Sequence, residues 1–405
     1  MSQTTNHNPH IFWVQTDALG EFLASGSFLG TVPVLRREGW RVTLVSEGEH
    51  GEDGIVNGVP VLEIARPDIY FLGQVIFHWR VMMWLHRNWD DVDIVLLHEM
   101  SAVWLFLMRL IGFIRPNRPL FVMDTRTLPM IAEENRSLKD VLRDAYYATI
   151  EHTASWWLDG QLAITERMAE AVHVKPEMLW GMWPSGVEAE KFVTAYENRD
   201  WSTMENGIRL VYVGSLTRER NLLALCEAVS KAREEDMLFE FHMVGGGTAL
   251  DELKAYAAQT DGHIIVDDPI PHDEIPQVLA DAHLGVLVFP DELRFQVSSP
   301  IKLFEYQAAG LPIFASSIAC HTDVVGGDNY AIWADETDVD GLVVALRDTW
   351  AKREQLPQMG EEAYAATDNW TWAASARKLG RALQAGLEKY VPVQQTQYQA
   401  MEDSQ

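Results

Sequence analysis

The chain alternates short apolar runs with longer segments in which apolar residues recur at helical spacing. Runs rich in Val, Ile, Leu and Phe are typical of strands buried on both faces, and the segments between them are typical of crossover helices. The pattern therefore predicts an α/β fold with a parallel sheet covered by helices. The first series of predicted strands lies at 10–16, 41–46, 59–64, 93–99, 119–125 and 160–165.

A second series of the same kind follows a break in the pattern. The break is "MWPSGVEAEKF" (182–192), whose Pro and Gly are typical of a domain boundary. Two successive α/β series predict two Rossmann-like domains. The C-terminal stretch 392–405 is Gln-rich and lacks periodicity, which predicts disorder. The second series predicts strands at 208–214, 238–247, 263–268, 284–290 and 312–316, with helices at 221–235, 248–259 and 272–282.

Charge and cysteine content narrow the possible partners and the compartment. The chain has 405 residues and a formal net charge of −27 at pH 7, with acidic excess in both halves. Such a field repels polyanions, so we predict no nucleic-acid partner. Cys226 and Cys320 cannot form a disulfide framework and show no metal-ligand spacing, which favours a reducing compartment. The polar N-terminus lacks the plan of a signal peptide, so we predict a cytoplasmic location.

One apolar run leaves two interpretations open. "VWLFLMRLIGFI" (Val103–Ile114) is too short to span a bilayer and contains Arg109. It predicts either a helix packed on the sheet or, with Arg115 and Arg118 beside it, a helix lying in the plane of a membrane surface. The preceding segment repeats the mixture of Trp, Met and basic residues, so the predicted membrane contact covers 75–118.

Ligands of open α/β sheets bind beyond the carboxyl ends of the strands, which directs attention to the loops of the second series. Gly214 follows a predicted strand and precedes Ser215, and Arg220 lies where a basic side chain can meet phosphate oxygens. Gly245 opens a run of three glycines after the next strand, which permits close backbone approach to a ligand.

The segment "SSPIKLFEYQAAGLPIFAS" (298–316) offers a denser set of polar groups. Ser298 and Ser299 supply hydroxyls at a predicted helix start, where Pro300 fits. Lys302 and Glu305 would share one face of that helix. Such a pair is ordinarily a surface ion pair. It can also be two ligands, a lysine for a diphosphate and a carboxylate for vicinal ribose hydroxyls.

Several motifs occur together in the order and spacing of one enzyme family. The chain resembles the retaining glycosyltransferases of the GT-B fold, which has two facing Rossmann-like domains and a deep interdomain cleft. The likeness is greatest to the large family that includes sucrose synthases and bacterial mannosyl- and glucosyltransferases. It covers most of 160–390 and is weaker but colinear over 10–150. The motifs are "WPSGVEAEKF", "YVGSLTRERN", "HMVGGG", "PIPHDEIPQVLADAHLGVLVFP" and "SSPIKLFEYQAAGLPIFAS".

The resemblance assigns roles to residues of the second half. Glu305 matches the glutamate that holds the ribose hydroxyls, Arg220 the lysine that binds the diphosphate, and Gly214 the glycine of a Gly-Arg loop. There are two departures: Val297 stands at the position of another motif glutamate, and Ser215 at that of the loop arginine. Part of the family carries SP-x-K-x-x-E-Y instead, which this chain fits, so Lys302 would supply the positive charge.

Candidates in the first half rest on looser matches. Gly20 lies with Gly26 and Ser27 in a loop after the first strand, where the family has a Gly-rich acceptor or phosphate loop. His98 ends a predicted strand and matches a frequent histidine of the family, although it could equally be a structural cap. Asp124 ends the next strand, where a carboxylate could orient an acceptor or stabilise positive charge on the sugar. Arg126 is expected to pair with acidic neighbours, and His272 with Asp273 to form a helix cap.

Together these features predict a retaining hexosyltransferase that uses a nucleoside-diphosphate sugar and needs no metal. Asp124, His98, Arg220 and Lys302 are the candidate catalytic residues. The predicted organisation is an acceptor domain at 1–190, a nucleotide-sugar domain at 191–372, a helix at 373–391 that packs back on the first domain, and the tail. One alternative is a catalytically weakened member that serves as the binding or regulatory subunit of a glycosylation complex. A third, less favoured, is a sugar-nucleotide epimerase or glycosyl phosphorylase.

Overall fold

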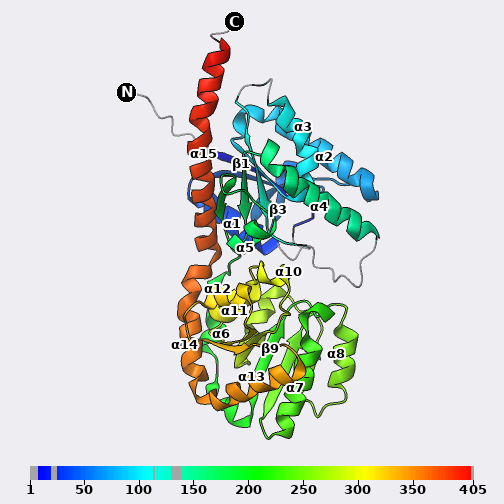
Figure 1. The fold of residues 1–405 in the computed structure, drawn as a ribbon, viewed down its shortest axis with the longest axis vertical. Helices are drawn as coiled ribbons and strands as arrows, with labels where there is room; N and C mark the ends of the chain where they lie inside the picture. Colours follow the sequence, from blue (N-terminus) through cyan, green and yellow to red (C-terminus); the bar gives the residue numbers. More distant parts are fainter. Residues whose placement is uncertain (1–7, 20–24, 113–114, 116, 129–137, 403–405) are drawn as a thin grey trace. The chain divides into compact units, whose positions relative to one another are not determined.

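The computed structural model describes residues 8–19, 25–112, 115, 117–128 and 138–402. The chain divides into two compact units, each described by itself below. Unit 1 comprises Met1–Pro184 and Trp372–Gln405, and unit 2 comprises Ser185–Thr371. The last segment of the chain thus belongs to the same unit as the first (Figure 1).

Unit 1 contains a sheet of order β3-β4-β2-β1-β5-β6-β7-β8. All its strand pairs are parallel except β3 with β4. The strands are β1 (His10–Val14), β2 (Arg41–Glu47), β3 (Gly54–Val56), β4 (Val59–Ile64), β5 (Ile94–Leu97), β6 (Leu120–Thr125), β7 (Gly160–Ala163) and β8 (Leu179–Met182).

Both faces of this sheet are buried. Side chains of successive strand residues point to opposite faces, so each strand contributes to two cores. Ile11 and Trp13 of β1 face one core, and Phe12 and Val14 face the other. The first core is closed by α1 (Ser25–Arg37) and α15 (Trp372–Glu402), and the second by α2 (Tyr70–Arg87), α3 (Glu99–Ile111) and α4 (Leu138–Trp157) (Figure 1). The short helix α5 spans Glu166–Ala171.

Unit 2 contains a fully parallel sheet of order β11-β10-β9-β12-β13-β14 around one core. Its strands are β9 (Ile208–Val213), β10 (Phe239–Val244), β11 (Ile264–Asp267), β12 (Leu284–Leu287), β13 (Ile313–Ser316) and β14 (Ala331–Ala334). Its helices are α6 (Val193–Glu197), α7 (Leu222–Glu234), α8 (Leu250–Ala257), α9 (Ile275–Ala280), α10 (Leu293–Gln296), α11 (Ile301–Ala308), α12 (Ala319–Val325), α13 (Val339–Ala351) and α14 (Leu356–Ala366).

The strand orders locate where each unit can bind a ligand. In unit 2 the order reverses between β9 and β12, and in unit 1 between β1 and β5. Ligands of open α/β sheets bind outside the carboxyl ends of strands at such a switch point. The loops that follow β9 and β12 contain Gly214 and the segment before α11, and the residue directly after β5 is His98.

The predicted α/β fold with two Rossmann-like domains is confirmed, and the differences have local causes. The strand predicted at 59–64 coincides with β4, whereas β3, β8 and β14 were not predicted. β3 and β14 are short, and β8 reads "LWGM" with partly exposed side chains, so neither apolar run length nor alternation marks them. α15 continues through residues 392–402, and the disorder expected from the Gln-rich composition of 392–405 stays a prediction.

Candidate functional site

Two glycine loops of unit 2 are packed backbone against backbone at the carboxyl ends of β9 and β10. Gly214 and Gly245 have φ values of +152° and +155°, which L side chains rarely adopt. A Cβ on Gly245 would lie 1.8 Å from the carbonyl oxygen of Gly214, so glycine is required there. A Cβ on Gly214 would lie 3.6 Å from Cε of Lys302, which places the first loop beside α11.

Glu305 is a buried carboxylate beside that loop. Its side chain is only 4% exposed, and Oε2 lies 2.8 Å from Nζ of Lys302. Burial by itself would raise the pKa of Glu305, but the positive charge of Lys302 and a hydrogen bond with His272 lower the pKa below its usual value. The two residues predicted to be separate ligands are therefore partners of each other here, yet the pair differs from a solvated surface pair because Glu305 is removed from water.

His272 joins this cluster, a contact that the sequence analysis missed. His272 and Asp273 were expected to form a helix cap, but the N-cap residues of the 3-10 helix His272–Glu274 and of α9 are Pro271 and Glu274, and neither makes a side-chain cap bond. The Nε2 of His272 lies 3.3 Å from Oε1 of Glu305 instead. His272 lies 33 positions before Glu305 in the chain, so no local spacing signals the contact.

Arg220 presents its guanidinium to aromatic rings. Its Cζ lies 4.4 Å from the ring centroid of Phe289 and 5.2 Å from that of Phe295. Within the described part of the chain no carboxylate forms an ion pair with Arg220, so its charge is held by ring faces. A guanidinium stacked in this way keeps its donors available for an anion.

The remaining predicted residues of unit 2 have structural contacts. Ser298 Oγ donates to the carbonyl oxygen of Phe295 (2.7 Å), and Ser299 Oγ accepts from the backbone N–H of Ser185 (3.0 Å). The carbonyl oxygen of Ser215 accepts from the hydroxyl of Tyr212. Val297, at the end of α10, is 1% exposed.

In unit 1, Asp124 is the second-last residue of β6 and lies inside a polar cluster. Its side chain accepts a hydrogen bond of 2.9 Å from the indole N–H of Trp183, and the guanidinium of Arg126 lies 3.6 Å from the Trp183 ring centroid. Burial raises the pKa of Asp124 to about 6, although the charge of Arg126 opposes the shift. The Arg126 guanidinium thus lies against the Trp183 indole and donates to the backbone carbonyl oxygen of Trp183. Burial lowers the pKa of Arg126 and outweighs the negative charge of Asp124, which raises the pKa.

His98 caps α3 and also contacts a second acid. Its Nδ1 accepts from the backbone N–H of Met100, which is the structural role left open by the sequence. Its Nε2 lies 2.9 Å from Oε2 of Glu99, whose side chain is 3% exposed. Burial lowers the pKa of His98, but the charge of Glu99 outweighs it and raises the pKa. Glu99 was not predicted, because a single glutamate at a helix start is an ordinary feature.

The glycine-rich loop after β1 is only partly covered. Gly20 lies outside the described residues. Gly26 and Ser27 belong to the first turn of α1; Ser27 is buried, and a Cβ on Gly26 would meet nothing within 4 Å.

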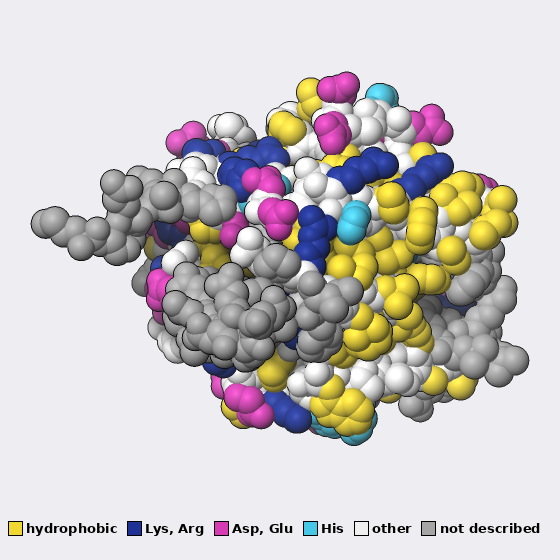
Figure 2. Space-filling model, turned by 90° about the horizontal axis from the view of Figure 1, so that it is seen from above, with side chains coloured by type: hydrophobic (Ala, Val, Ile, Leu, Met, Phe, Trp, Pro, Cys, Tyr) yellow, Lys and Arg dark blue, Asp and Glu magenta, His cyan; other side chains and the backbone are white. Residues whose placement is uncertain are grey.

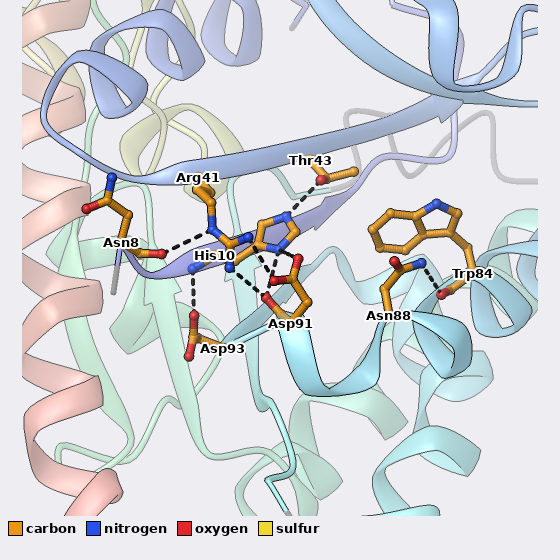
Figure 3. Close-up of polar contacts among 8 residues, drawn as sticks. All are labelled: Asn8, His10, Arg41, Thr43, Trp84, Asn88, Asp91 and Asp93. Carbon is orange, nitrogen blue, oxygen red and sulfur yellow. Dashed lines mark hydrogen bonds and ion pairs between the residues drawn. The ribbon is translucent and has the colours of Figure 1, made fainter. Parts of the chain in front are cut away.

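Two Asp-x-Asp spacings in the chain have structural partners. Asp91 accepts from Arg41 (2.8 Å) and contacts His10 Nδ1, and Asp93 accepts from the backbone N–H of His10 (2.7 Å) (Figure 3). These residues lie at the amino ends of β1 and β5, away from the expected ligand edge. Asp338 caps α13, and Asp340 pairs with Lys231. Within the described ranges, no cluster of acidic, His and Cys side chains could hold a metal ion.

Comparisons with known proteins extend this picture. Residues 207–352 match the family model described as "Glycosyl transferases group 1". A GDP-mannose-dependent α-(1-6)-phosphatidylinositol monomannoside mannosyltransferase of Mycolicibacterium smegmatis is 25% identical over 49% of this chain and 55% of its own length. A UDP-Gal:α-D-GlcNAc-diphosphoundecaprenol α-1,3-galactosyltransferase of Escherichia coli is 27% identical over 40% of this chain and 43% of its own. The chain therefore matches about half the length of these curated relatives.

Similar solved structures cover nearly the whole chain at low sequence identity. Anabaena HepE in complex with UDP-glucose has a TM-score of 0.69 at 13% identity, covering 94% of this chain and 100% of HepE. The catalytic domain of starch synthase IV from Arabidopsis thaliana, bound to ADP and acarbose, has a TM-score of 0.68 at 10% identity, covering 94% and 99%. These likenesses establish the fold. Residues 207–352 thus match a glycosyl transferases group 1 domain, within a chain that has the GT-B fold.

Proposed function

We propose that this protein is a retaining glycosyltransferase that moves a hexose from a nucleoside-diphosphate sugar to an acceptor hydroxyl. Unit 2 binds the donor, with Glu305 accepting from the ribose hydroxyls. Arg220 and Lys302 stabilise the negative charge that develops on the departing diphosphate. Acceptor attack occurs on the face from which the diphosphate leaves, as the family resemblance implies, and the transfer needs no metal.

The observation that carries this proposal is the buried Glu305 beside the Gly214 loop. A carboxylate removed from water and kept ionised by Lys302 is a strong acceptor for vicinal hydroxyls. The close approach of Gly214 and Gly245 leaves backbone rather than side chains at the carboxyl end of β9. Arg220, whose guanidinium lies over the rings of Phe289 and Phe295, supplies a second cation at the same switch point.

In unit 1, Asp124 and His98 are proposed to orient the acceptor or the donor sugar. Asp124 is half protonated near pH 6, so it can either donate or accept a proton in the physiological range. The names of both curated relatives specify lipid-linked acceptors. We propose the same acceptor class for this chain, with the reaction in the cytoplasm.

A donor screen tests the proposal. UDP, GDP, ADP and their sugars are added to the full chain, and the rise in melting temperature identifies the ligand. Glu305→Ala should weaken binding of that ligand by roughly 10- to 100-fold, because a hydrogen bond to a charged group is lost. Glu354→Ala changes an exposed glutamate of the same unit and is the control. Unchanged affinity in Glu305→Ala would refute the assignment of the ribose site.

Val297 and Ser215 motivate a second candidate function, the catalytically weakened subunit. Both stand where the family resemblance expects a charged side chain, and Val297 is buried. Donor hydrolysis and transfer assays separate the candidates once the donor is known. Tight donor binding without hydrolysis or transfer would favour the subunit; turnover with any acceptor would favour the enzyme.

A further inference from the structure

The helix α3 is apolar on two faces. Ala102, Leu105 and Met108 point into the core of unit 1. A second stripe at i, i+3, i+4 and i+7 spacing faces outward, and a helix in an aqueous protein ordinarily carries polar residues there. The stripe consists of Val103 (45% exposed), Phe106 (37%), Leu107 (55%) and Leu110 (44%).

The neighbouring helices continue this surface. α2 and α4 pack on either side of α3 against the same core. Trp79 of α2 is 61% exposed and Trp156 in the last turn of α4 is 73% exposed. Leu72, two helical turns before Trp79, also faces outward. Figure 2 shows hydrophobic side chains dominating one part of the surface, on the side where Figure 1 places these three helices.

The exposed charges of α2 and α3 are of one sign, whereas α4 carries both acidic and basic residues. α2 contains no Asp or Glu, and the single acid of α3, Glu99, is buried against His98. The last turn of α2 carries His86 and Arg87, and Arg80, which directly follows Trp79, is also exposed. Lys, Arg and His side chains border the hydrophobic area (Figure 2). In a chain of net charge −27, this local absence of exposed acids on two successive helices is a marked departure.

Arg109, Arg115 and Arg118, which the sequence pattern placed beside a membrane surface, contact other groups of the protein instead. Arg118 forms two hydrogen bonds of 2.7 and 2.8 Å with the carboxylate of Asp159, which is 3% exposed. Arg109 lies 3.6 Å from the same carboxylate. Arg115 contacts Asp90 and His86. Two of the three arginines thus hold a buried acid, and reversing their charge would disrupt the fold rather than test lipid binding.

We propose that the outward surface of α2, α3 and α4 lies on a lipid bilayer that contains anionic lipid, with α3 in the plane of the interface. Apolar stripes flanked by Trp and bordered by basic residues are the composition of interfacial helices. None of the helices in the described ranges is both long and apolar enough to cross a membrane, so the contact is peripheral. A second copy fits less well, because a two-fold contact buries the same surface of both copies and would bring the basic side chains of both into one interface.

Vesicle co-sedimentation of the full chain tests this proposal. The probes are vesicles of phosphatidylcholine alone and of phosphatidylcholine mixed with phosphatidylglycerol. The variant Trp79→Gln/Val103→Gln/Leu107→Gln should lose at least about tenfold in partitioning, because three side chains no longer enter the interface. The matched control, Leu238→Gln/Leu293→Gln/Val344→Gln, changes three equally exposed apolar residues of unit 2 and should bind like the wild type.

Further measurements separate charge attraction from apolar insertion, and test whether a second copy of the chain covers this surface instead. Arg80→Gln/Arg87→Gln should reduce binding to the anionic vesicles only, and added salt should do the same. Brominated lipid should quench fluorescence in the wild type more than in Trp79→Phe. Circular dichroism and donor binding check that each variant is folded. Equal partitioning of the Gln variant and the wild type would overturn the proposal. So would a lipid-free dimer that the Gln variant converts to monomer.

Discussion

Asp124 is a carboxylate in a buried layer of unit 1, and its protonation depends on competing neighbours. Burial favours the neutral acid, and the charge of Arg126 together with the Trp183 indole N–H favours the anion. Burial prevails, and the pKa rises to about 6. The group is therefore poised close to physiological pH, where a small change in its surroundings changes its charge.

The Trp183 indole N–H should report this titration directly. Its nitrogen donates to Asp124, so its resonance in a spectrum of ¹⁵N-labelled protein should shift with a midpoint near pH 6. Asp124→Asn keeps an oxygen acceptor but cannot ionise, and the shift should disappear. Trp183→Phe assigns the resonance. A wild-type midpoint near 4, the value of an ordinary aspartate, would contradict the effect of burial.

The raised pKa of Asp124 also makes the free energy of unfolding depend on pH. Because the folded-state pKa lies above the unfolded value of about 3.9, folding binds a proton, and the free energy of unfolding falls as pH rises from about 4 to about 6. This difference in pKa corresponds to roughly 3 kcal/mol of stability, of which about half is lost between pH 5 and pH 8. Asp124→Asn should lack this part of the pH dependence in urea unfolding.

At this scale the sequence predicts local groupings better than distant ones. Lys302 and Glu305 share a helix turn, so their proximity follows from spacing alone. His272 reaches Glu305 from 33 positions away, and Trp183 reaches Asp124 from 59 positions away. Such contacts depend on the order of strands in the sheet. No periodicity or motif within either segment encodes them.

Among the elements, the paired glycine loops of unit 2 depend most on one residue type. Gly245→Ala would place a Cβ against the Gly214 carbonyl oxygen at a φ of +155°. We expect a loss of roughly 3 kcal/mol in the free energy of unfolding, from backbone strain and overpacking together. Donor binding should weaken as well, because the loop after β9 must move. Urea unfolding and isothermal titration with the identified donor measure the two effects.

Gly262→Ala is the control for this variant. Its φ is also positive, at +81°, but nothing lies within 4 Å of the added Cβ. It should cost only about 1 kcal/mol of backbone strain and leave donor binding unchanged. Equal effects of the two substitutions would mean that φ, and not the contact between loops, determines the glycine.

The elements themselves were largely predictable, and α3 shows where the pattern stops being informative. Buried strands and amphipathic helices have distinct periods, so β1, β4 and α7 emerge close to their observed bounds. α3 is apolar around most of its circumference, which fits both a core helix and a membrane-surface helix. The structure assigns one face to the core and leaves the other outward.

For the molecule as a whole, the two units differ in how the chain completes them. All residues of the unit 2 core lie within Ser185–Thr371, a single continuous segment. Unit 1 instead needs α15, which begins 188 positions after Pro184. Ala376, Leu379 and Leu383 of α15 complete the core on the α1 side of its sheet. A family resemblance can imply this arrangement, but the helix pattern alone does not say which unit it joins.

Truncation after Thr371 should therefore affect the units unequally. Unit 1 loses buried apolar side chains worth about 1.5–3 kcal/mol each, a sum comparable to the whole stability of a domain. The surfaces that α15 covers at Gly30 of α1 and Gly181 of β8 would also be exposed. Unit 2 should keep its own cooperative transition in calorimetry, recognised because the donor shifts it. The transition assigned to unit 1 should vanish.

Truncation after Tyr390 is the matched control, because the side-chain contacts of α15 described above precede that residue. Trp180 packs against Gly386 and Tyr390, so this shorter deletion leaves the interface with β8 intact. Both calorimetric transitions should then persist at nearly unchanged temperatures. If the longer truncation also retained both transitions, α15 would be dispensable, and the division of the chain into these two units would not describe how it unfolds.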